Sequence, residues 1–483
     1  MAADRLRNYI AGEWKDSKTS EYLDVLNPAT GKAIAQVPLS TAADVEHAVA
    51  AARDAFQEWR ETPPTTRIQY LFRLKELMEE HFEDIARIVT TENGKTLDEA
   101  RGETRRTIEN VEVATGVTSL MMGRNLEDVA RGIDEEIVRQ PMGVFAVIAP
   151  YNFPAMVPWW FAPYAMATGN TYIVKPSEQV PLTQSKIFEL VHELDLPPGV
   201  MNLVHGGREV VDILTRSPDI VGISSVTSTP VAKAIYTAAT ASGKRAQCQA
   251  GAKNFIVIMP DADLDRTIPA LLTSCYGCAG QRCLAGAVLV PVGDACEPLR
   301  DRFVEAAAKL KVGDPLDESV QMGPVISKQH KGRVLRHIEQ GLKEGAKLVL
   351  DGRRVTVPGY EEGYFVGPTV FDGVAREMTL AREEIFGPVI GILKVGSLDE
   401  AIKVIDANPY GNASSIFTAS GGAAREFKYR VKCGNIGINV GVAAPMAFFP
   451  FGGRKDSFFG DLHGQGEDVI DFFTEKKVVI TRW

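Results

Sequence analysis

The sequence predicts an α/β protein built on doubly wound parallel sheets, and three observations carry this prediction. From residue 144 onward, short runs rich in β-branched residues alternate with helical segments. The runs VFAVI, TYIVK and NFIVI are almost continuously apolar, which is typical of parallel strands buried on both faces. The length of 483 residues is too great for one core, so we expect more than one such unit.

The first third of the chain is predicted to be mainly helical. Thr41 and Asp44 precede the run VEHAVAAARDAFQEW and predict a helix with a side-chain cap at its start. The segment 64–93 continues with apolar residues three and four apart, and the Gly-Lys pair at 94–95 interrupts it. A further amphipathic helix is predicted over ARGETRRTIENVEVATG, and a second series of strands and helices over about 253–440.

Two segments alternate between polar and apolar residues and fit neither core. These are IDEEIVRQ at 133–140 and the final stretch DVIDFFTEKKVVITRW. We expect both to be exposed ribbons that pair with another subunit.

Composition and charge narrow the class of protein. The net charge of -9 disfavours nucleic acid or an anionic membrane as the main partner, because both require a basic face. No apolar run reaches the roughly 20 residues that cross a bilayer. The charged N-terminus does not resemble a signal peptide, and six cysteines are too sparse for a disulfide framework, so we expect a cytoplasmic protein.

Cys283 lies in the glycine-rich run GCAGQRCLAG, where a cysteine can be a nucleophile, a metal ligand or small core filler. Cys275 and Cys278 form a C-x-x-C pair, but no second pair of ligands follows, so we expect no metal site. We interpret these two cysteines as core residues. Around Cys283 the glycines suit a loop that brings backbone amides close to a reacting atom, which favours the nucleophile.

Five motifs occur in order along nearly the whole chain: APYNFP at 149–154, VKPSE at 174–178, GQRC at 280–283, EIFGP at 384–388 and PFGGRKDSFFGD at 450–461. Together they resemble the NAD(P)-dependent aldehyde dehydrogenase superfamily. PYNFPAMVPWW, GAKN, PMAFFPFGG and the ending SFFGDLHGQG are similar to its methylmalonate semialdehyde dehydrogenase branch, which oxidises a short carboxylated aldehyde to an acyl-CoA.

The resemblance implies an aldehyde dehydrogenase-like fold with two doubly wound parallel-sheet domains and a β-ribbon oligomerisation arm. We expect an NAD-binding domain over 1–124 and 144–252, a catalytic domain over 253–440, and the arm over 125–143 and 460–483. The protein is then expected to be a homo-oligomer, either a dimer or a tetramer.

The resemblance also implies the catalytic groups. The Cys283 thiolate would attack the aldehyde to form a thiohemiacetal, and loss of hydride would leave a thioester on sulfur. The Asn152 side chain and the Cys283 backbone N–H would stabilise the alkoxide. From the residues alone, Asn152 could equally be a turn cap.

For the cofactor, no G-x-G-x-x-G follows any predicted strand, so the residues that bind NAD are assigned by the resemblance. A carboxylate at Glu178 would accept hydrogen bonds from a free ribose hydroxyl and repel a 2'-phosphate, which favours NAD over NADP. Alternatively, Lys175 and Glu178 flank a surface turn, and EIFGP merely begins a strand. Ser225 and Thr227 depart from the family pattern of Phe and Gly. The assigned residues are Ala149, Tyr151, Lys175, Ser177, Glu178, Ser228, Gln249, Glu384 and Phe386.

Gln249 stands where hydrolytic members of the superfamily carry a glutamate that activates water. An amide cannot accept that proton, so we expect coenzyme A to be the acyl acceptor. Glu384 or a relayed water is the alternative base.

Arg106 and Arg282 match two arginines that the branch uses to bind the substrate carboxylate, a task that suits the planar guanidinium. Arg105 competes with Arg106, and arginines on an amphipathic helix are usually solvated. A positive charge beside Cys283 is expected to lower the pKa of its thiol.

The sequence therefore predicts NAD-dependent oxidation of a small anionic aldehyde, with methylmalonate or malonate semialdehyde leading and the carboxylate lost as carbon dioxide or bicarbonate. The alternatives are a hydrolytic enzyme for succinate-type or sulfonated semialdehydes and a non-catalytic relative that retains the fold.

Overall fold

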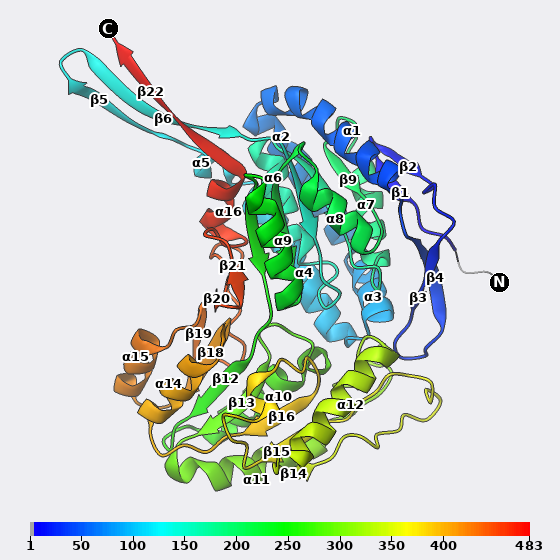
Figure 1. Ribbon diagram of the computed structural model, residues 1–483, viewed down its shortest axis with the longest axis vertical. Coiled ribbons are helices and arrows are strands. Elements are labelled where there is room, and N and C mark those ends of the chain that lie inside the picture. Colours follow the sequence, from blue (N-terminus) through cyan, green and yellow to red (C-terminus); the bar gives the residue numbers. More distant parts are fainter. Residues whose placement is uncertain (1–3) are drawn as a thin grey trace.

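The computed structural model describes residues 4–483, which form two large sheets and a projecting three-stranded ribbon (Figure 1). The first sheet has the strand order β2-β1-β9-β8-β7-β10-β11-β21, and its five central strands are parallel. Its strands are β1 (Asn8–Ile10), β2 (Glu13–Lys15), β7 (Val144–Ile148), β8 (Thr171–Lys175), β9 (Met201–Leu203), β10 (Ile220–Val226), β11 (Arg245–Gln249) and β21 (Phe458–Phe459).

The second sheet has the order β14-β15-β16-β13-β12-β18-β19, and only β14 runs antiparallel to its neighbour. Its strands are β12 (Asn254–Ile258), β13 (Gly286–Pro291), β14 (Lys347–Leu350), β15 (Thr369–Asp372), β16 (Val389–Ile392), β18 (Ala413–Phe417) and β19 (Asn435–Ile438). The predicted doubly wound α/β fold is confirmed.

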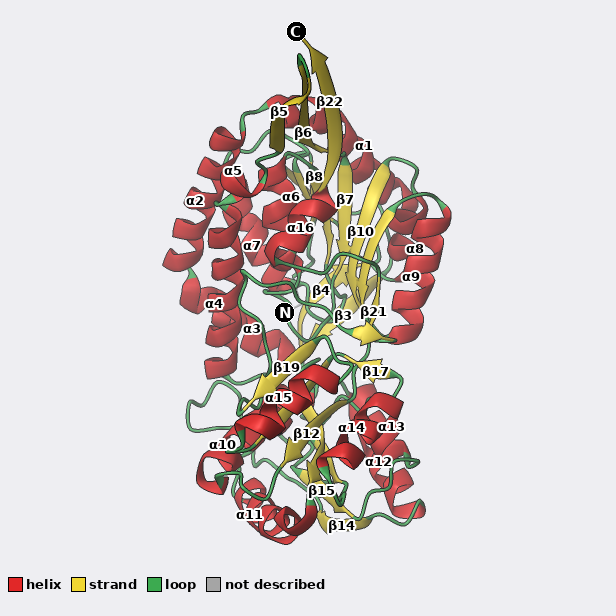
Figure 2. Ribbon diagram, turned by 90° about the vertical axis from the view of Figure 1, so that its left-hand side faces the viewer, coloured by secondary structure: helices red, strands yellow, loops and turns green. Residues whose placement is uncertain are grey.

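Helices cover both faces of the first sheet (Figure 2). Val144, Ala146 and Ile148 of β7 pack into a core with α1, α8 and α9, whereas the intervening Phe145 and Val147 pack into a core with α2, α4 and α6. This alternation follows from the period of two in a strand.

The helices of both halves of the molecule have these bounds: α1 (Ala42–Glu61), α2 (Pro64–Glu80), α3 (Phe82–Asn93), α4 (Leu97–Ala114), α5 (Val117–Leu120), α6 (Ala162–Thr168), α7 (Leu182–His192), α8 (Arg208–Arg216), α9 (Thr229–Ala241), α10 (Leu264–Tyr276), α11 (Cys296–Ala308), α12 (Lys328–Lys343), α13 (Thr379–Arg382), α14 (Leu398–Ala407), α15 (Gly421–Arg430) and α16 (Gly466–Phe473).

The helical N-terminal third forms as predicted. The Thr41 side chain accepts a hydrogen bond from the Asp44 amide, and the Asp44 carboxylate accepts one from the Thr41 amide, which satisfies two amides at the start of α1. Helix α3 ends at Gly94, and α4 starts at Leu97 after the Thr96 cap. Within residues 4–483, no helix has both the length and the apolar character needed to cross a bilayer.

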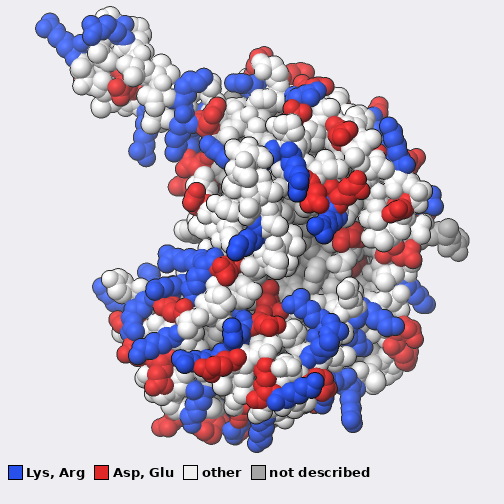
Figure 3. Space-filling model, viewed as in Figure 1, with Lys and Arg blue, Asp and Glu red and all other residues white. Residues whose placement is uncertain are grey.

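The ribbon consists of β5 (Arg124–Ala130), β6 (Ile133–Pro141) and β22 (Thr474–Arg482) and projects from the body of the molecule (Figures 1 and 3). On the face in Figure 3, acidic and basic side chains are interspersed over the body.

The prediction of a ribbon over the whole C-terminal stretch is wrong for its first part. Residues 466–473 form helix α16, and Val469, Ile470, Phe472 and Phe473 pack into the first core. Their spacing of three and four residues places them on one helical face, so burial outweighs their tendency to form a strand. The division into functional domains remains a proposal, and residues 1–3 of its first segment lie outside the described residues.

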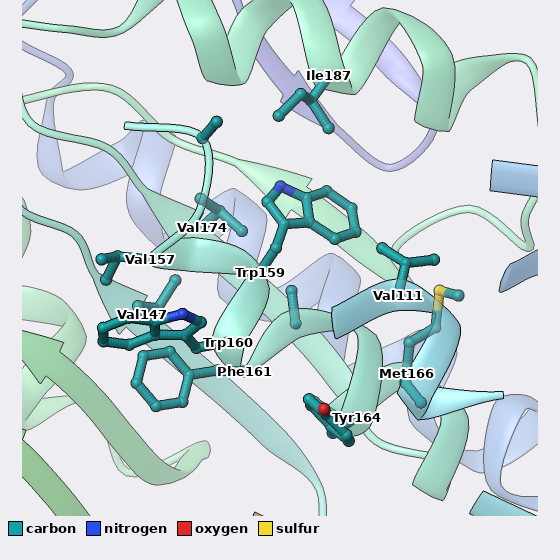
Figure 4. Close-up of a cluster of buried hydrophobic side chains, with 14 of the residues drawn as sticks. Val111, Val147, Val157, Trp159, Trp160, Phe161, Tyr164, Met166, Val174 and Ile187 are labelled. Carbon is teal, nitrogen blue, oxygen red and sulfur yellow. The ribbon is translucent and has the colours of Figure 1, made fainter. Parts of the chain in front are cut away.

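The segment that follows β7 is supported by a dense apolar cluster. Trp159, Trp160 and Phe161 lie beside Val147 of β7 and Val174 of β8 (Figure 4). This packing holds the segment 151–161 rigidly at the carboxyl end of the first sheet.

Candidate active site

The Cys283 loop connects α10 and the 3-10 turn Gly277–Gly280 to β13. Its geometry requires glycine at position 280, where φ is +73° and a Cβ would lie 2.3 Å from the Gly387 carbonyl oxygen. The Cys283 carbonyl accepts hydrogen bonds from the side chains of Asn254 and Asn412, both at 2.8 Å. Hydrogen bonds from β12 and from the segment just before β18 therefore fix the backbone of the candidate nucleophile.

Cys283 is partly exposed and lines a cavity of about 340 Å³. Arg106 from α4 and Arg282 line the same cavity, together with the aromatic side chains of Trp160 and Phe451. The structure thus brings together a thiol, two guanidinium groups and an apolar wall.

Arg105, the competing candidate, forms two hydrogen bonds with Glu79 at 2.6 and 2.8 Å on the exposed side of α4. Arg106 instead lines the cavity, where its Nη1 lies 3.3 Å from Glu109 Oε2 and 2.7 Å from the sulfur of Met446. The geometry favours Arg106 over Arg105 as the group that meets a ligand.

Asn152 follows β7 and is buried beside the Cys283 loop. Its Nδ2 donates a hydrogen bond of 3.1 Å to the carbonyl of Gln281. The amide is therefore held beside the residues that precede the thiol, although Asn152 is not among the residues that line the Cys283 cavity.

Arg282 lowers the pKa of the Cys283 thiol, as expected from its positive charge, but the net shift of that pKa is upward. Burial raises the pKa of the Cys283 thiol to about 12, and the Glu384 carboxylate acts in the same direction. Arg282 opposes both effects but does not outweigh them, because removing the thiolate from water costs more than one cation returns.

This raised pKa predicts the pH dependence of alkylation. Iodoacetamide should modify Cys283 about tenfold faster for each unit of pH between about 7 and 10, because the thiolate fraction grows in that proportion below the pKa. The measurement is mass spectrometry of the peptide that contains Cys283, with Cys283→Ser as the blank. A rate that levels off near pH 8 would contradict this assignment.

Seven of the nine cofactor candidates lie at the carboxyl ends of the parallel strands of the first sheet, where ligands of such sheets bind, and Glu384 and Phe386 lie before β16 of the second sheet. Lys175 ends β8 and its buried Nζ lies 3.3 Å from Glu178 Oε2. Burial lowers the pKa of Lys175, while Glu178 opposes this shift. The Ser177 side chain accepts a hydrogen bond from the Gln179 amide at 3.3 Å, and this bond stabilises the turn that follows β8.

Ala149 and Tyr151 follow β7 in the same row of strand ends. The Ala149 amide donates to the Lys175 carbonyl at 3.0 Å, and the Tyr151 ring packs edge-on against Phe386 at 5.9 Å between ring centroids. The ring contact joins the segment after β7 of the first sheet to the loop before β16 of the second.

Ser228 is the N-cap of α9, and its side chain makes no capping hydrogen bond. Its hydroxyl and the first amides of this helix are thus available to an anion. Thr227 has an ordinary backbone conformation and its amide bonds to the Gln249 carbonyl at 3.1 Å, so the departure from glycine introduces no backbone strain.

Glu384 lies in the loop before β16 and accepts a hydrogen bond from the Ala252 amide at 3.0 Å. A Cβ at Gly251 would lie 2.7 Å from Thr229 Oγ1 and 3.0 Å from Glu384 Oε2, so only glycine lets these groups converge. Burial raises the pKa of Glu384 to about 7, against the Ala252 hydrogen bond and Lys253. Phe386 has a φ of +59°, and its carbonyl bonds to His330 Nε2 at 2.7 Å.

Gln249 ends β11 and is buried. Its Nε2 donates to the carbonyl of Phe451, which lines the cavity with Cys283, at 2.9 Å. Its Oε1 accepts no hydrogen bond within residues 4–483. The side chain is therefore close to the cavity wall, with one acceptor oxygen free and no group able to take a proton.

Sequence reasoning missed Asn254 and Asn412, which hold the Cys283 carbonyl, and His330, which holds the Phe386 loop. Asn254 stands at the end of the GAKN motif, the one local signal that could have identified it. Within the described residues no group of three His, Cys, Asp or Glu side chains could hold a metal ion.

The chain matches a known protein family over most of its length. The profile of the aldehyde dehydrogenase family matches residues 14–479. Malonate-semialdehyde dehydrogenase 1 of Geobacillus thermodenitrificans is 48% identical over 479 residues, which cover 99% of each chain. Malonate-semialdehyde dehydrogenase of Halalkalibacterium halodurans is 47% identical over 480 residues, again covering 99% of each.

Solved structures give the same result. A Sinorhizobium meliloti protein assigned as methylmalonate-semialdehyde dehydrogenase and crystallised with NAD has a TM-score of 0.98 and 39% identity, over 100% of this chain and 98% of that chain. Methylmalonate-semialdehyde dehydrogenase of Oceanimonas doudoroffii has a TM-score of 0.98 and 44% identity, over 99% and 98%. This chain therefore belongs to the aldehyde dehydrogenase family.

Proposed function

We propose that this protein oxidises a small carboxylated semialdehyde of the malonate or methylmalonate type, with NAD as the hydride acceptor and coenzyme A as the acyl acceptor. The observation that carries the proposal is the cavity that Cys283 shares with Arg106 and Arg282. The relatives named for malonate and methylmalonate semialdehyde support the substrate class.

The chemistry centres on the Cys283 sulfur. Its thiolate attacks the aldehyde carbon, and the oxygen that becomes negative is stabilised by the Asn152 amide and the Cys283 backbone N–H. Loss of hydride from this carbon leaves a thioester on Cys283. Attack by the thiol of coenzyme A then releases the acyl group and restores the cysteine.

The residues at the strand ends fit NAD. Lys175 and Glu178 offer a donor and an acceptor to a ribose, and a carboxylate there disfavours a 2'-phosphate. The open N-terminus of α9 at Ser228 suits a pyrophosphate, and Glu384 can accept hydrogen bonds from a second ribose. Bound NAD would supply the hydride acceptor. A relative crystallised with NAD supports this assignment.

Two guanidinium groups suit the substrate carboxylate. Arg106 and Arg282 enter the cavity from different elements, so together they can fix the end of the aldehyde that carries the charge. A bidentate guanidinium–carboxylate pair adds both attraction and orientation, which favours a carboxylated aldehyde over a neutral one.

The acyl acceptor follows from Gln249. The amide can orient a nucleophile through its free oxygen but cannot deprotonate water, so hydrolysis of the thioester should be slow. A thiol is already a good nucleophile, which favours coenzyme A.

We also propose that the protein is a homo-oligomer formed through the ribbon. Leu126, Val478 and Ile480 are exposed on its strands, and an exposed strand with apolar side chains is readily covered by another subunit.

An assay of NADH formation with and without coenzyme A tests the proposal. Malonate semialdehyde with coenzyme A should give sustained turnover, and omission of coenzyme A should leave little more than a single turnover. Gln249→Glu should raise the turnover without coenzyme A by roughly 100-fold, because it restores a general base. Sustained turnover of the unaltered protein without coenzyme A would favour the hydrolytic alternative.

A further inference from the structure

A buried ion pair lies directly behind Asn152. Lys95, between α3 and α4, and Glu103 of α4 have fully buried side chains, and Lys95 Nζ lies 2.5 Å from Glu103 Oε2. Lys95 also donates to the backbone carbonyl of Asn152 at 2.7 Å and lies 3.9 Å from the centre of the Phe153 ring. The ammonium group is thus anchored to the residue whose amide is proposed to stabilise the alkoxide.

The second oxygen of Glu103 holds the same segment at its other end. Glu103 Oε1 accepts hydrogen bonds from the amides of Ala155 at 2.8 Å and Met156 at 3.1 Å. One carboxylate therefore bridges the ammonium group and two amides of an irregular turn. No regular secondary structure would otherwise satisfy these amides.

The neighbouring Asn93 completes the support. Its Nδ2 donates to the carbonyl of Tyr151 at 2.8 Å. Backbone groups of residues 151, 152, 155 and 156 are thus all bonded by side chains from the end of α3, the connection at Lys95 and the second turn of α4. This set of bonds fixes the turn that carries Asn152 relative to the helices.

The energetics argue that the pair has a role beyond packing. Burying two charges costs solvation free energy that their attraction repays only partly, so apolar residues of the same size would often be as stable. Apolar residues could not bond to the Asn152 carbonyl and the two amides. The ion pair therefore fixes the position of the backbone that carries the Asn152 side-chain amide.

We propose that the Lys95–Glu103 ion pair is a positioning element that holds the Asn152 amide in reach of the oxyanion. This inference rests on the proposed function of Asn152 and deepens it. The pair touches neither substrate nor cofactor and acts through the backbone of 152–156.

A double-mutant cycle tests the proposal on the full-length protein. Glu103→Asp keeps the charge but is one methylene too short to reach both Lys95 and the amides. We expect it to lower the single-turnover rate of NADH formation by on the order of 10- to 100-fold, since small displacements of catalytic groups have effects of this size. In an Asn152→Ala background, where the amide is already absent, the same change should alter the rate less than about twofold.

A purely structural role would give a different pattern. Equal losses in the two backgrounds, or no loss in the parent background, would overturn the proposal. Glu103→Gln, which keeps one acceptor oxygen, is the second variant if Glu103→Asp does not yield folded protein. The matched control is Glu79→Asp, which shortens an exposed ion pair with Arg105 of the same helix and should leave the rate unchanged.

The choice of aldehyde separates this inference from the proposed function. The cycle is run with propanal, which carries no carboxylate and needs no coenzyme A in a single turnover. If propanal is not oxidised, malonate semialdehyde replaces it. If the protein oxidises propanal as well as malonate semialdehyde, the proposed substrate is wrong. The double-mutant cycle with propanal still shows whether the ion pair positions Asn152.

Discussion

Replacing Cys283 with alanine is expected to lower NADH formation by on the order of 10⁴-fold or more, because the covalent route is lost and no other described side chain in the cavity is a comparable nucleophile. The measurement is NADH absorbance with malonate semialdehyde, NAD and coenzyme A. Cys283→Ser should be similarly inactive, since a hydroxyl is far less ionised than a thiol.

Cys296→Ala provides the control for this experiment. Cys296 is a buried cysteine of α11 in the second core, and its loss should cost some stability without changing the rate of the folded protein. Full activity in Cys283→Ser would show that the sulfur is not the reacting atom.

Replacing Arg106 with glutamine is expected to lower kcat/KM for malonate semialdehyde by about 100-fold and for propanal by less than about threefold. The reason is that a charge-assisted hydrogen-bonded pair with the substrate carboxylate is removed, which typically costs about 1.5–3 kcal/mol, or roughly 10- to 150-fold. Steady-state kinetics with both aldehydes measures the effect as a change in selectivity.

Arg105→Gln is the matched control, because Arg105 is the adjacent residue on α4 but pairs with Glu79 on the exposed side. It should leave both values of kcat/KM unchanged. If Arg106→Gln lowers kcat/KM equally for the two aldehydes, then Arg106 supports the cavity and does not bind the substrate carboxylate. In that case Arg282 would be left as the candidate for this role.

The parts of the fold that follow from local patterns were predictable from the sequence. The apolar strands β7, β8 and β12 are buried on both faces, and their patterns predict this directly. Strands β11 and β18 were not predicted, because Gln247 and Ser414 interrupt their apolar runs. Gln247 Nε2 donates a hydrogen bond to Ser224 Oγ at 3.1 Å, and Ser414 Oγ donates one to the Phe255 carbonyl at 2.7 Å, in each case on a neighbouring strand. Such pairs are visible only once the strands are assembled.

The candidate site was likewise predictable from the sequence only in part. Motifs in sequence order indicated the cysteine, the asparagine and the strand ends, and the structure places Arg106, Arg282 and Cys283 on one cavity. Arg282 lowers the pKa of Cys283 as its position in the sequence predicted, but the burial of the thiol, which outweighs this effect, is not visible in the sequence. The contacts of Lys95 and Glu103 with the segment 152–156 join residues about 50 positions apart and depend on the folded arrangement.

The most direct test of the central claim is to trap the acyl group on the protein. The protein is mixed with NAD and malonate semialdehyde without coenzyme A, quenched in acid and digested with pepsin at low pH, where a thioester survives, and the peptide that contains Cys283 is isolated. We predict a malonyl or acetyl thioester on Cys283 of that peptide, in an amount equal to the NADH formed, and none on Cys296. NADH formed in stoichiometric amount with Cys283 unmodified would contradict the account.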